Sequence, residues 1–247
     1  MISLFFFFQS LDCDIMIQNR RRKTMEDKYH LTREQNVFIA KRNIVDYIWK
    51  SANLEGIGVT YPETQAIYDG GVVNGLTVEN VIAINNLKYA WQFILEEPGI
   101  KDNFHVLCYI HKLVADKLVL EQHLGKLRTT PVQIGGTKWQ PTFPFETQIK
   151  EEMEEILSQT EKTTTEIAIE IMLYIMRKQM FIDGNKRVAM LFANKIMIDH
   201  GCGIISIAQE NQATFYEKLI KYYETGNWDE LKQWIYDYCI DGMELNA

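Results

Sequence analysis

The chain has 247 residues, of which 47% are hydrophobic and 24% are charged, so it can bury one substantial core. Its net charge of −7 argues against nonspecific binding to nucleic acids or anionic membranes, because both need surplus positive charge. The cysteines Cys13, Cys108, Cys202 and Cys239 form no CxxC pair, which indicates reduced thiols of a cytosolic protein rather than a disulfide framework or zinc site.

The N-terminal segment begins with an apolar run at residues 2–8, far shorter than the roughly 20 residues of a membrane span. Basic residues 20–23 follow this run, whereas a secretory signal places them before it. Two interpretations remain: a start codon assigned too early, or a short loose tail. Met16 and Met25 are both candidate true starts, and we favour Met25. We expect residues 1–30 to form a poorly ordered tail without a function.

The first predicted helix covers residues 32–56, where apolar residues recur at helical spacing. Thr32 is a candidate N-cap, and Gln35 completes a capping-box pattern. Gly56 is typical of a helix C-terminus. Residues 61–74 contain Pro62 and two glycines and are predicted to be a loop.

Helical periodicity predicts most of the remaining chain. Thr77 and Thr163 are the candidate N-caps of two of these helices. The histidines at positions 105, 111 and 123 have no metal-binding spacing, and each is predicted to be a packed or partly exposed structural residue. The predicted helices are residues 77–98, 104–124, 146–159, 167–176, 188–198, 211–223 and 228–239, with residues 146–159 forming a charged, solvated outer face.

One stretch favours β-structure. Alternating apolar residues around two glycines predict a small hairpin over residues 130–139, which taken alone could be a surface hairpin with no role. The residues at its tip are Val132, Gln133, Ile134, Gly135 and Gly136.

A tight turn at Asp183 and Gly184 leads directly into the helix that begins near Asn185. The first N–H groups of a helix have no intrahelical partner and lie at its positive end, so they can bind an anion. Lys186 and Arg187 add cationic donors suited to phosphate, and Asp183 is an oxygen ligand of the kind that Mg²⁺ prefers. The alternative is an N-cap followed by a solvated basic first turn.

This stretch, Phe181-x-Asp183-Gly184-Asn185-Lys186-Arg187, together with Asn194, resembles the Fic/Doc (Fido) signature, His-x-Phe-x-Asp/Glu-Gly-Asn-Gly/Lys-Arg. Many members of that family transfer AMP from ATP to a protein hydroxyl. The resemblance implies a mainly α fold, a helical bundle with a β-hairpin flap that clamps the target segment.

The same resemblance implies a domain layout and a set of ligands. It predicts a single domain over residues 31–247, with an inhibitory helix at 32–56 and C-terminal helices at 211–240. ATP and Mg²⁺ are the implied cofactors, with Asp183 at the metal, and the flap residues 132–136 would hold a target protein. The implied nucleotide-binding residues are Gly184, Asn185, Lys186, Arg187 and Asn194.

Two positions depart from the family pattern. Gln179 stands where the family has its histidine, and an amide is not basic enough to take a proton from the acceptor hydroxyl. Ser51, Glu55 and Gly56 match the inhibitory motif of class II Fic proteins, in which the glutamate obstructs the γ-phosphate position. The arginine that pairs with this glutamate is replaced here by Met190, so Glu55 would act through Arg187 or by repelling phosphate.

Three hypotheses follow. The preferred one is a Mg²⁺·ATP-binding protein derived from a protein AMP transferase and weakened by Gln179. The second is an active Fic/Doc-type phosphotransferase or toxin that uses another base, because Lys186 also resembles the Doc form of the motif. The third is a non-enzymatic scaffold that binds proteins in the flap groove. The expected partners are a nucleotide and a hydroxyl side chain of a target protein, and no nucleic acid or membrane is expected. Formation of a homodimer is left undecided by the sequence.

Overall fold

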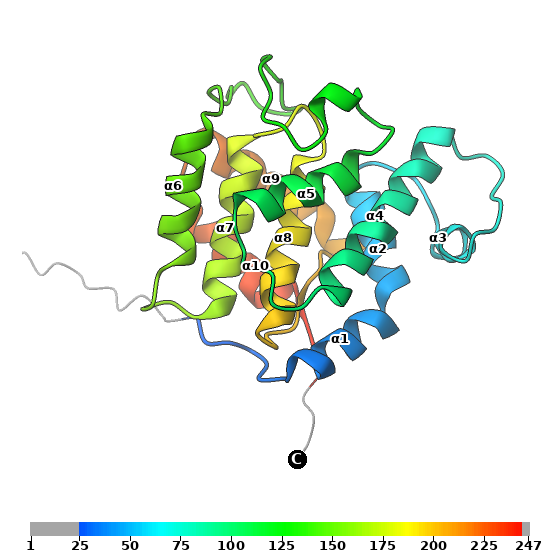
Figure 1. The fold of residues 1–247 in the computed structure, drawn as a ribbon, viewed down its shortest axis with the longest axis horizontal. Coiled ribbons are helices and arrows are strands. Elements are labelled where there is room, and N and C mark those ends of the chain that lie inside the picture. Colours follow the sequence, from blue (N-terminus) through cyan, green and yellow to red (C-terminus); the bar gives the residue numbers. More distant parts are fainter. Residues whose placement is uncertain (1–24, 244–247) are drawn as a thin grey trace, which may run out of the picture.

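Helices α7 and α8 form the centre of the fold (Figure 1). The computed structural model describes residues 25–243. Every residue of α8 except Lys186 and Asp199 is buried, which is typical of a helix inside a bundle rather than on its surface. Helices α1, α4, α5 and α7 and strand β1 surround α8. The protein is therefore mainly α, as predicted.

The elements in chain order are α1 (Arg33–Arg42), α2 (Ile44–Leu54), α3 (Tyr61–Tyr68), α4 (Val78–Glu96), α5 (Phe104–Ala115), the 3₁₀ turn η1 (Glu121–His123), α6 (Glu146–Leu157), α7 (Thr164–Lys178), α8 (Asn185–Asp199), β1 (Ile204–Ile205), the 3₁₀ turn η2 (Gln209–Asn211), α9 (Gln212–Thr225), α10 (Asp229–Tyr238) and β2 (Ile240–Asp241). No helix in the described part of the chain is both long and apolar enough to cross a membrane.

The predicted helix caps are confirmed. Thr32 accepts a hydrogen bond from the backbone N–H of Gln35, whose side chain accepts one from the N–H of Thr32. Thr77 and Thr163 cap α4 and α7 in the same way, each accepting from a backbone N–H three residues later. These local hydrogen bonds satisfy donors that helix geometry leaves free, which is why sequence alone could locate them.

Three predicted boundaries were wrong. The helix expected over residues 32–56 breaks at Asn43, where ψ is 12°, and becomes α1 and α2. The loop expected over residues 61–74 contains α3, because Thr60 and Glu63 form a capping box and Pro62 lies in the first turn, where proline is tolerated. The helix expected over 104–124 ends at Ala115.

The prediction of paired strands over residues 130–139 was also wrong. A turn forms at residues 135–136, but the arms on either side are irregular. Pro131 and Pro141 lack the N–H that a β-ladder needs, which disfavours pairing of these arms. Within residues 25–243 the sheet is instead β1 paired antiparallel with β2, with Ile205 opposite Ile240.

The predicted N-terminal tail needs a correction at its end. Residues 1–24 lie outside the described part, whereas Met25 is buried and its carbonyl accepts a hydrogen bond from Thr163 Oγ1. The carboxylate of Asp27 accepts from the N–H of Thr165 in the first turn of α7, at a distance of 2.8 Å. These contacts join residues 25–30 to the domain.

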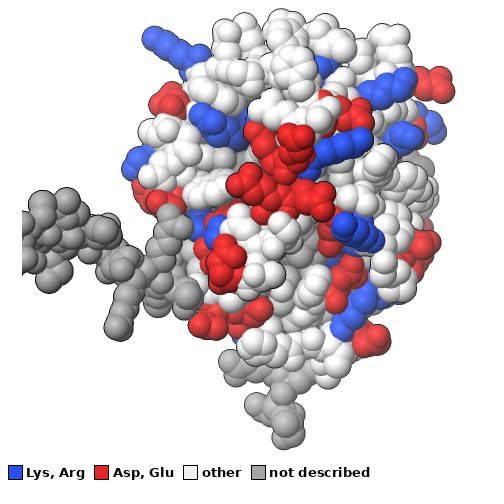
Figure 2. Space-filling view, turned by 60° about the vertical axis from the view of Figure 1, so that its left-hand side comes forward, with Lys and Arg blue, Asp and Glu red and all other residues white. Residues whose placement is uncertain are grey.

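Helix α6 is the charged outer helix that the sequence predicts. It buries only Ile149, Met153 and Ile156. Figure 2, turned to bring this side of the molecule forward, shows acidic side chains gathered on that face, consistent with the exposed glutamates of α6. This face therefore carries a cluster of acidic side chains.

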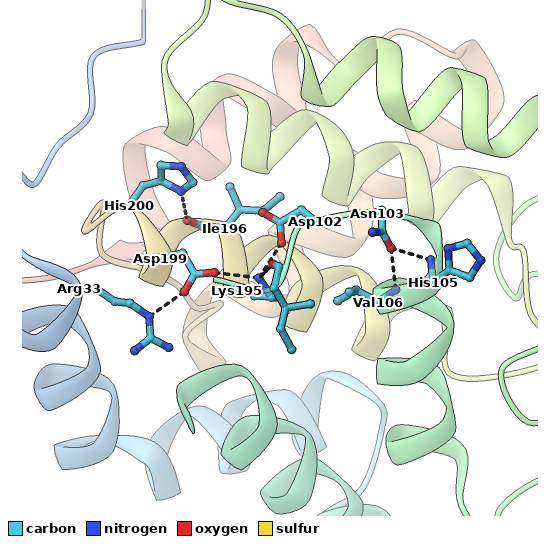
Figure 3. Close-up of polar contacts among 10 residues, drawn as sticks. Arg33, Asp102, Asn103, His105, Val106, Lys195, Ile196, Asp199 and His200 are labelled. Carbon is cyan, nitrogen blue, oxygen red and sulfur yellow. Dashed lines mark hydrogen bonds and ion pairs between the residues drawn. The ribbon is translucent and has the colours of Figure 1, made fainter. Parts of the chain in front are cut away.

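A network of ion pairs joins α8 to α1 and to the segment that precedes α5 (Figure 3). Lys195 is fully buried, and its ammonium lies 2.9 Å from Asp102 Oδ1 and 2.8 Å from Asp199 Oδ2. The third donor of the ammonium reaches the Ile100 carbonyl at 2.7 Å. Arg33 in α1 then pairs with the other oxygen of Asp199 at 2.8 Å. The network was not predicted from the sequence, because its members come from three separate segments.

We expect Lys195→Met to lower the free energy of unfolding by about 3–5 kcal/mol, because the partly buried Asp102 and Asp199 would lose a fully buried cation. Urea unfolding of the variant and of Lys41→Met, which removes an exposed lysine, would measure this difference. An unfolding free energy for Lys195→Met within 0.5 kcal/mol of the wild type, roughly the usual range for surface changes, would contradict a stabilising role for the network.

Candidate functional site

The motif loop, residues 179–184, joins α7 to α8 at the end of the bundle where the irregular chain between α5 and α6 also lies (Figure 1). Gln179 ends α7 in the left-handed region with φ of 46°, which is uncommon for a residue other than glycine. Gly184 also has a positive φ of 76°, and a Cβ there would lie 3.4 Å from Cγ1 of Val114. The loop therefore turns sharply and presents the N-terminus of α8.

Asn185 holds the loop in this shape. Its Oδ1 accepts from the N–H of Phe181 at 2.9 Å, and its Nδ2 donates to the Phe181 carbonyl at 2.9 Å and to Gln179 Oε1 at 3.2 Å. Asn185, which was predicted to bind the nucleotide, therefore uses its side-chain amide for hydrogen bonds within the protein. Asn185 acts here as a brace of the motif loop.

His111 supports the loop from α5. It is fully buried and stacks on Phe181 with ring centroids 3.9 Å apart. Its Nδ1 accepts from the N–H of Gly125 at 2.8 Å, so Nε2 carries the proton and faces the Asp183 carbonyl at 3.3 Å. Burial lowers the pKa of His111 to about 4, and the ring is neutral at physiological pH. The prediction of a packed structural histidine agrees with this geometry, although the sequence did not indicate its place beside the motif.

The structure brings Lys186, Arg187 and Glu55 together. Glu55 follows α2, and its Oε2 lies 3.8 Å from Arg187 Nε while its Oε1 lies 3.6 Å from Lys186 Nζ. These distances exceed hydrogen-bond length, and both Glu55 Oε1 and Arg187 Nε are buried without a hydrogen-bond partner. Arg187 Nη2 donates to Asp183 Oδ2 at 2.9 Å, whereas the carboxylate of Asp183 is largely exposed. An acidic group thus faces the cations at the start of α8.

The other predicted residues of the inhibitory motif form the end of α2. The carbonyl of Ser51 accepts from the N–H of Glu55, and Gly56 takes a positive φ of 78° directly after the helix. Ser51 and Met190 line the same small cavity, which has room for about one water molecule at 10 Å³. Met190, where the resemblance implies an arginine, therefore lies near α2, whereas the side chain of Glu55 lies near Lys186 and Arg187.

Asn194 is separate from this cluster. Its Nδ2 donates to the Ile205 carbonyl at 2.9 Å, and its Oδ1 accepts from the N–H of Ile205 at 2.7 Å. Both ends of the amide therefore hold strand β1 against α8. The predicted nucleotide-binding role of Asn194 has no support from these contacts.

Helix α9 holds the end of α2 beside the cations, which the sequence did not predict. The hydroxyl of Tyr216 donates to the Leu54 carbonyl, and Gln212 Nε2 donates to the Lys50 carbonyl at 3.0 Å. Lys186 Nζ lies 5.6 Å from the centre of the Tyr216 ring. The aromatic pattern of residues 211–223 predicted packing, but not that Tyr216 would lie at the site.

The predicted flap segment packs against α9. Gly136 has a positive φ of 84°, which favours glycine, and a Cβ there would lie 2.9 Å from Cδ1 at the end of the Ile220 side chain. Trp139 stacks on Tyr223 with ring centroids 5.7 Å apart. Ile134 also packs against the core, while Gln133 and Gly135 are exposed.

One buried arginine joins the flap segment to the motif loop. Arg128 Nε donates to the Gln179 carbonyl at 2.7 Å. Its two Nη atoms donate to the carbonyls of Thr130 at 2.9 Å, Pro141 at 3.3 Å and Thr142 at 2.6 Å. The guanidinium of Arg128 therefore binds the chain before the turn, at Thr130, and the chain after it, at residues 141–142, as well as Gln179. The sequence analysis did not include Arg128 among the site residues.

His111 generates a pH-dependent prediction. Its pKa is lowered in the folded state, so stability from the neutral ring is present above the unfolded value near 6.5 and is lost as the pH falls toward 4. When the pH is lowered from 7.5 to 5.0, protonation of His111 in the unfolded state should lower the free energy of unfolding of the wild type by about 2 kcal/mol. Urea unfolding of the wild type and of His111→Gln at both pH values would measure this. An equal loss in the two proteins would contradict the assignment.

Comparison with known proteins gives a family match over part of the chain. Residues 103–197 match the Fic/DOC family, a range that contains His111, Arg128 and the motif loop. The search of curated proteins gave no match.

Solved structures share the fold at low sequence identity. A Fic-1 structure from C. elegans has a TM-score of 0.69 and 19% identity, and the match covers 81% of this chain but only 62% of that one. A Fic domain-containing signaling protein from Bacteroides thetaiotaomicron has a TM-score of 0.66 and 16% identity, covering 84% and 85%. The BepC protein of Bartonella tribocorum, solved with bound AMPPNP, has a TM-score of 0.50 and 19% identity, covering 62% and 81%. Residues 103–197 therefore resemble the Fic/DOC family, and the chain shares the helical fold of these solved Fic structures.

Proposed function

We propose that this chain is a cytoplasmic Fic-type protein that binds Mg²⁺·ATP and descends from protein AMP transferases. In such a transfer the acceptor hydroxyl oxygen bonds to the α-phosphorus and pyrophosphate leaves. We further propose that Gln179 weakens the transfer and that Glu55 restrains nucleotide binding, as in class II Fic proteins.

The observation that carries this proposal is the group of charges at the start of α8. Arg187 Nε has no hydrogen-bond acceptor and lies 3.8 Å from Glu55 Oε2, while Arg187 Nη2 is paired with Asp183 at 2.9 Å. A phosphate oxygen there would receive hydrogen bonds from Arg187 and from the free N–H groups of the helix, and it would meet the positive end of the helix dipole. The bound AMPPNP of the Bartonella protein supports a nucleotide as the ligand.

The residues also fit a nucleotide-bound Mg²⁺. No cluster of three or more metal-ligating side chains occurs within residues 25–243. Mg²⁺ needs no such cluster, since it commonly takes one or two carboxylates and completes its shell with phosphate oxygens and water. Asp183 offers one exposed carboxylate oxygen beyond its contact with Arg187. When bound, the ion would offset the charge of the phosphates.

Gln179 is poorly suited to act as a base. Its Nε2 donates to the Met176 carbonyl at 2.6 Å, and its Oε1 accepts from Asn185. The side-chain amide is thus occupied within the loop, and an amide oxygen does not take a proton at physiological pH. Loss of general base catalysis typically slows such a step by about 10²–10⁴-fold, while positioning by the phosphate site persists.

Glu55 is suited to act as a displaceable restraint. Its carboxylate is near two cations but forms no hydrogen bond through Oε1. A nucleotide phosphate would compete for the same cations and would offer shorter, charge-assisted hydrogen bonds in exchange. Tyr216 and Gln212 hold the backbone of α2, so the glutamate can yield by a side-chain rotation while α2 stays in place.

We expect Glu55→Ala to tighten Mg²⁺·ATP binding about tenfold, which corresponds to about 1.4 kcal/mol for one removed like-charge contact. Isothermal titration calorimetry of this variant, with Glu79→Ala as an exposed-glutamate control, would measure the change. Adding Arg187→Ala should abolish binding while the melting temperature reports on folding. If Glu55→Ala fails to bind millimolar ATP, the nucleotide proposal is wrong and a scaffold role in the flap groove becomes preferable.

Restoring the histidine provides a separate test of the chemistry. In the Glu55→Ala background, we expect Gln179→His to raise transfer of labelled AMP onto protein by about 10²–10⁴-fold, because the imidazole can take the hydroxyl proton. Gln179→Asn is the matched control. If the protein with Gln179 transfers AMP as fast as the Gln179→His variant, the proposal that position 179 limits catalysis is wrong.

A further inference from the structure

A second pocket lies between the flap segment and the bundle, and neither the family match nor the motif assigns it a ligand. It has a volume of about 180 Å³ and is lined by residues 139–142, Tyr174, Arg177, Lys178 and Tyr222. Its walls thus come from the second arm of the flap segment and from α7 and α9. The pocket combines aromatic rings with two cationic side chains.

Arg177 lines this pocket, and its hydrogen bonding within the protein is incomplete. Its Nη2 donates to the Tyr223 carbonyl at 3.2 Å, and its Nε is buried without an acceptor. The guanidinium lies 4.6 Å from the centre of the Trp139 ring and 5.7 Å from that of Tyr222. Within the described part of the chain, Arg177 has no acidic side chain within 4 Å. An arginine that is held by aromatic rings yet lacks a carboxylate partner is pre-organised to bind one.

The second cation, Lys178, is already paired. Its Nζ lies 2.6 Å from Glu152 Oε2, which also accepts from the hydroxyl of Tyr174 at 2.6 Å. Glu152 therefore offsets the charge of Lys178, and the pocket retains one unpaired positive charge at Arg177. One such charge matches a carboxylate better than it matches a dianionic phosphate.

The pocket is adjacent to Gln179, the motif position at which the proposed function places the acceptor hydroxyl. Lys178 immediately precedes Gln179, and Arg128 binds the carbonyls of Gln179, Pro141 and Thr142. Pro141 and Thr142 line the pocket. The same guanidinium thus fixes the spacing between the pocket wall and position 179. A polypeptide that lies along the flap segment with its hydroxyl at the motif would place a neighbouring residue at this pocket.

We propose that this pocket binds an aspartate or glutamate side chain of the target polypeptide, next to the acceptor hydroxyl. Arg177 would bind the carboxylate and the aromatic walls would cover its methylene groups. This inference deepens the proposed function, on which it rests for the nature of the target, and it assigns acidic residues near the acceptor as a determinant of specificity.

The test measures peptide binding without nucleotide or transfer. ¹⁵N-labelled full-length protein is titrated with acetyl-Gly-Glu-Gly-Ser-Gly-amide, and the side-chain N–H signals of Arg177 and Trp139 are followed by NMR. Peptides with glutamine or phosphoserine in place of glutamate are the comparisons. We expect saturable shifts with the glutamate peptide and at least about tenfold weaker binding of the glutamine peptide, since a charged hydrogen bond is lost.

Variants identify the cation that binds the peptide. Arg177→Gln should reduce binding of the glutamate peptide to the level of the glutamine peptide, with the Trp139 signal as reporter. Arg177→Lys, which keeps the charge but loses the planar fork, should weaken binding by about threefold or more if the variant keeps the Trp139 signal. Lys101→Gln, at an exposed position outside the pocket, should leave binding unchanged.

Three results would overturn the proposal: no saturable shift at millimolar glutamate peptide, equal binding of the glutamate and glutamine peptides, or at least tenfold tighter binding of the phosphoserine peptide. None depends on ATP. If the protein does not bind ATP but shows a saturable, Arg177-dependent NMR shift with the peptide, the nucleotide proposal is rejected. The pocket then stands as a peptide-binding site.

Discussion

The burial of α8 is the constraint on which the rest of the structure depends. A helix enclosed on nearly all sides must find partners inside the protein for each of its polar side chains. Lys195 is paired with Asp102 and Asp199, and Asn194 with the backbone of Ile205. These contacts fix α8 relative to its neighbours. At the other end of the helix, Asn185 braces the motif loop through its two hydrogen bonds to Phe181.

At that N-terminus the pairing is incomplete. Arg187 has an exposed partner in Asp183 and a distant one in Glu55, and its Nε lacks an acceptor. A buried donor without an acceptor is costly to stability, and a ligand that completes its hydrogen bonding is one physical explanation for such a group. Glu55 offsets part of the charge in the absence of that ligand. The same contact would therefore stabilise the unliganded protein and oppose nucleotide binding.

The flap segment shows how one side chain can order a stretch that lacks regular structure. Its arms do not pair as strands, yet Arg128 binds carbonyls from both arms and from Gln179. Aromatic stacking of Trp139 on Tyr223 then joins the second arm to α9. The segment and the motif loop therefore respond as one unit to any change at position 128. The carboxylate pocket proposed at Arg177 lies within this unit.

The sequence alone determined the features that depend on local interactions. Helical periodicity, the caps at Thr32, Thr77 and Thr163, and the motif at residues 181–187 arise within a few residues of chain, so the mainly α fold and the turn that leads into α8 could be predicted. Tertiary structure decided the rest, because each remaining contact joins distant segments: Glu55 to Arg187, Arg128 to Gln179, and Lys195 to Asp102. It also decided that Asn185 and Asn194 would use their amides internally and that the prolines of the flap segment would leave its arms unpaired.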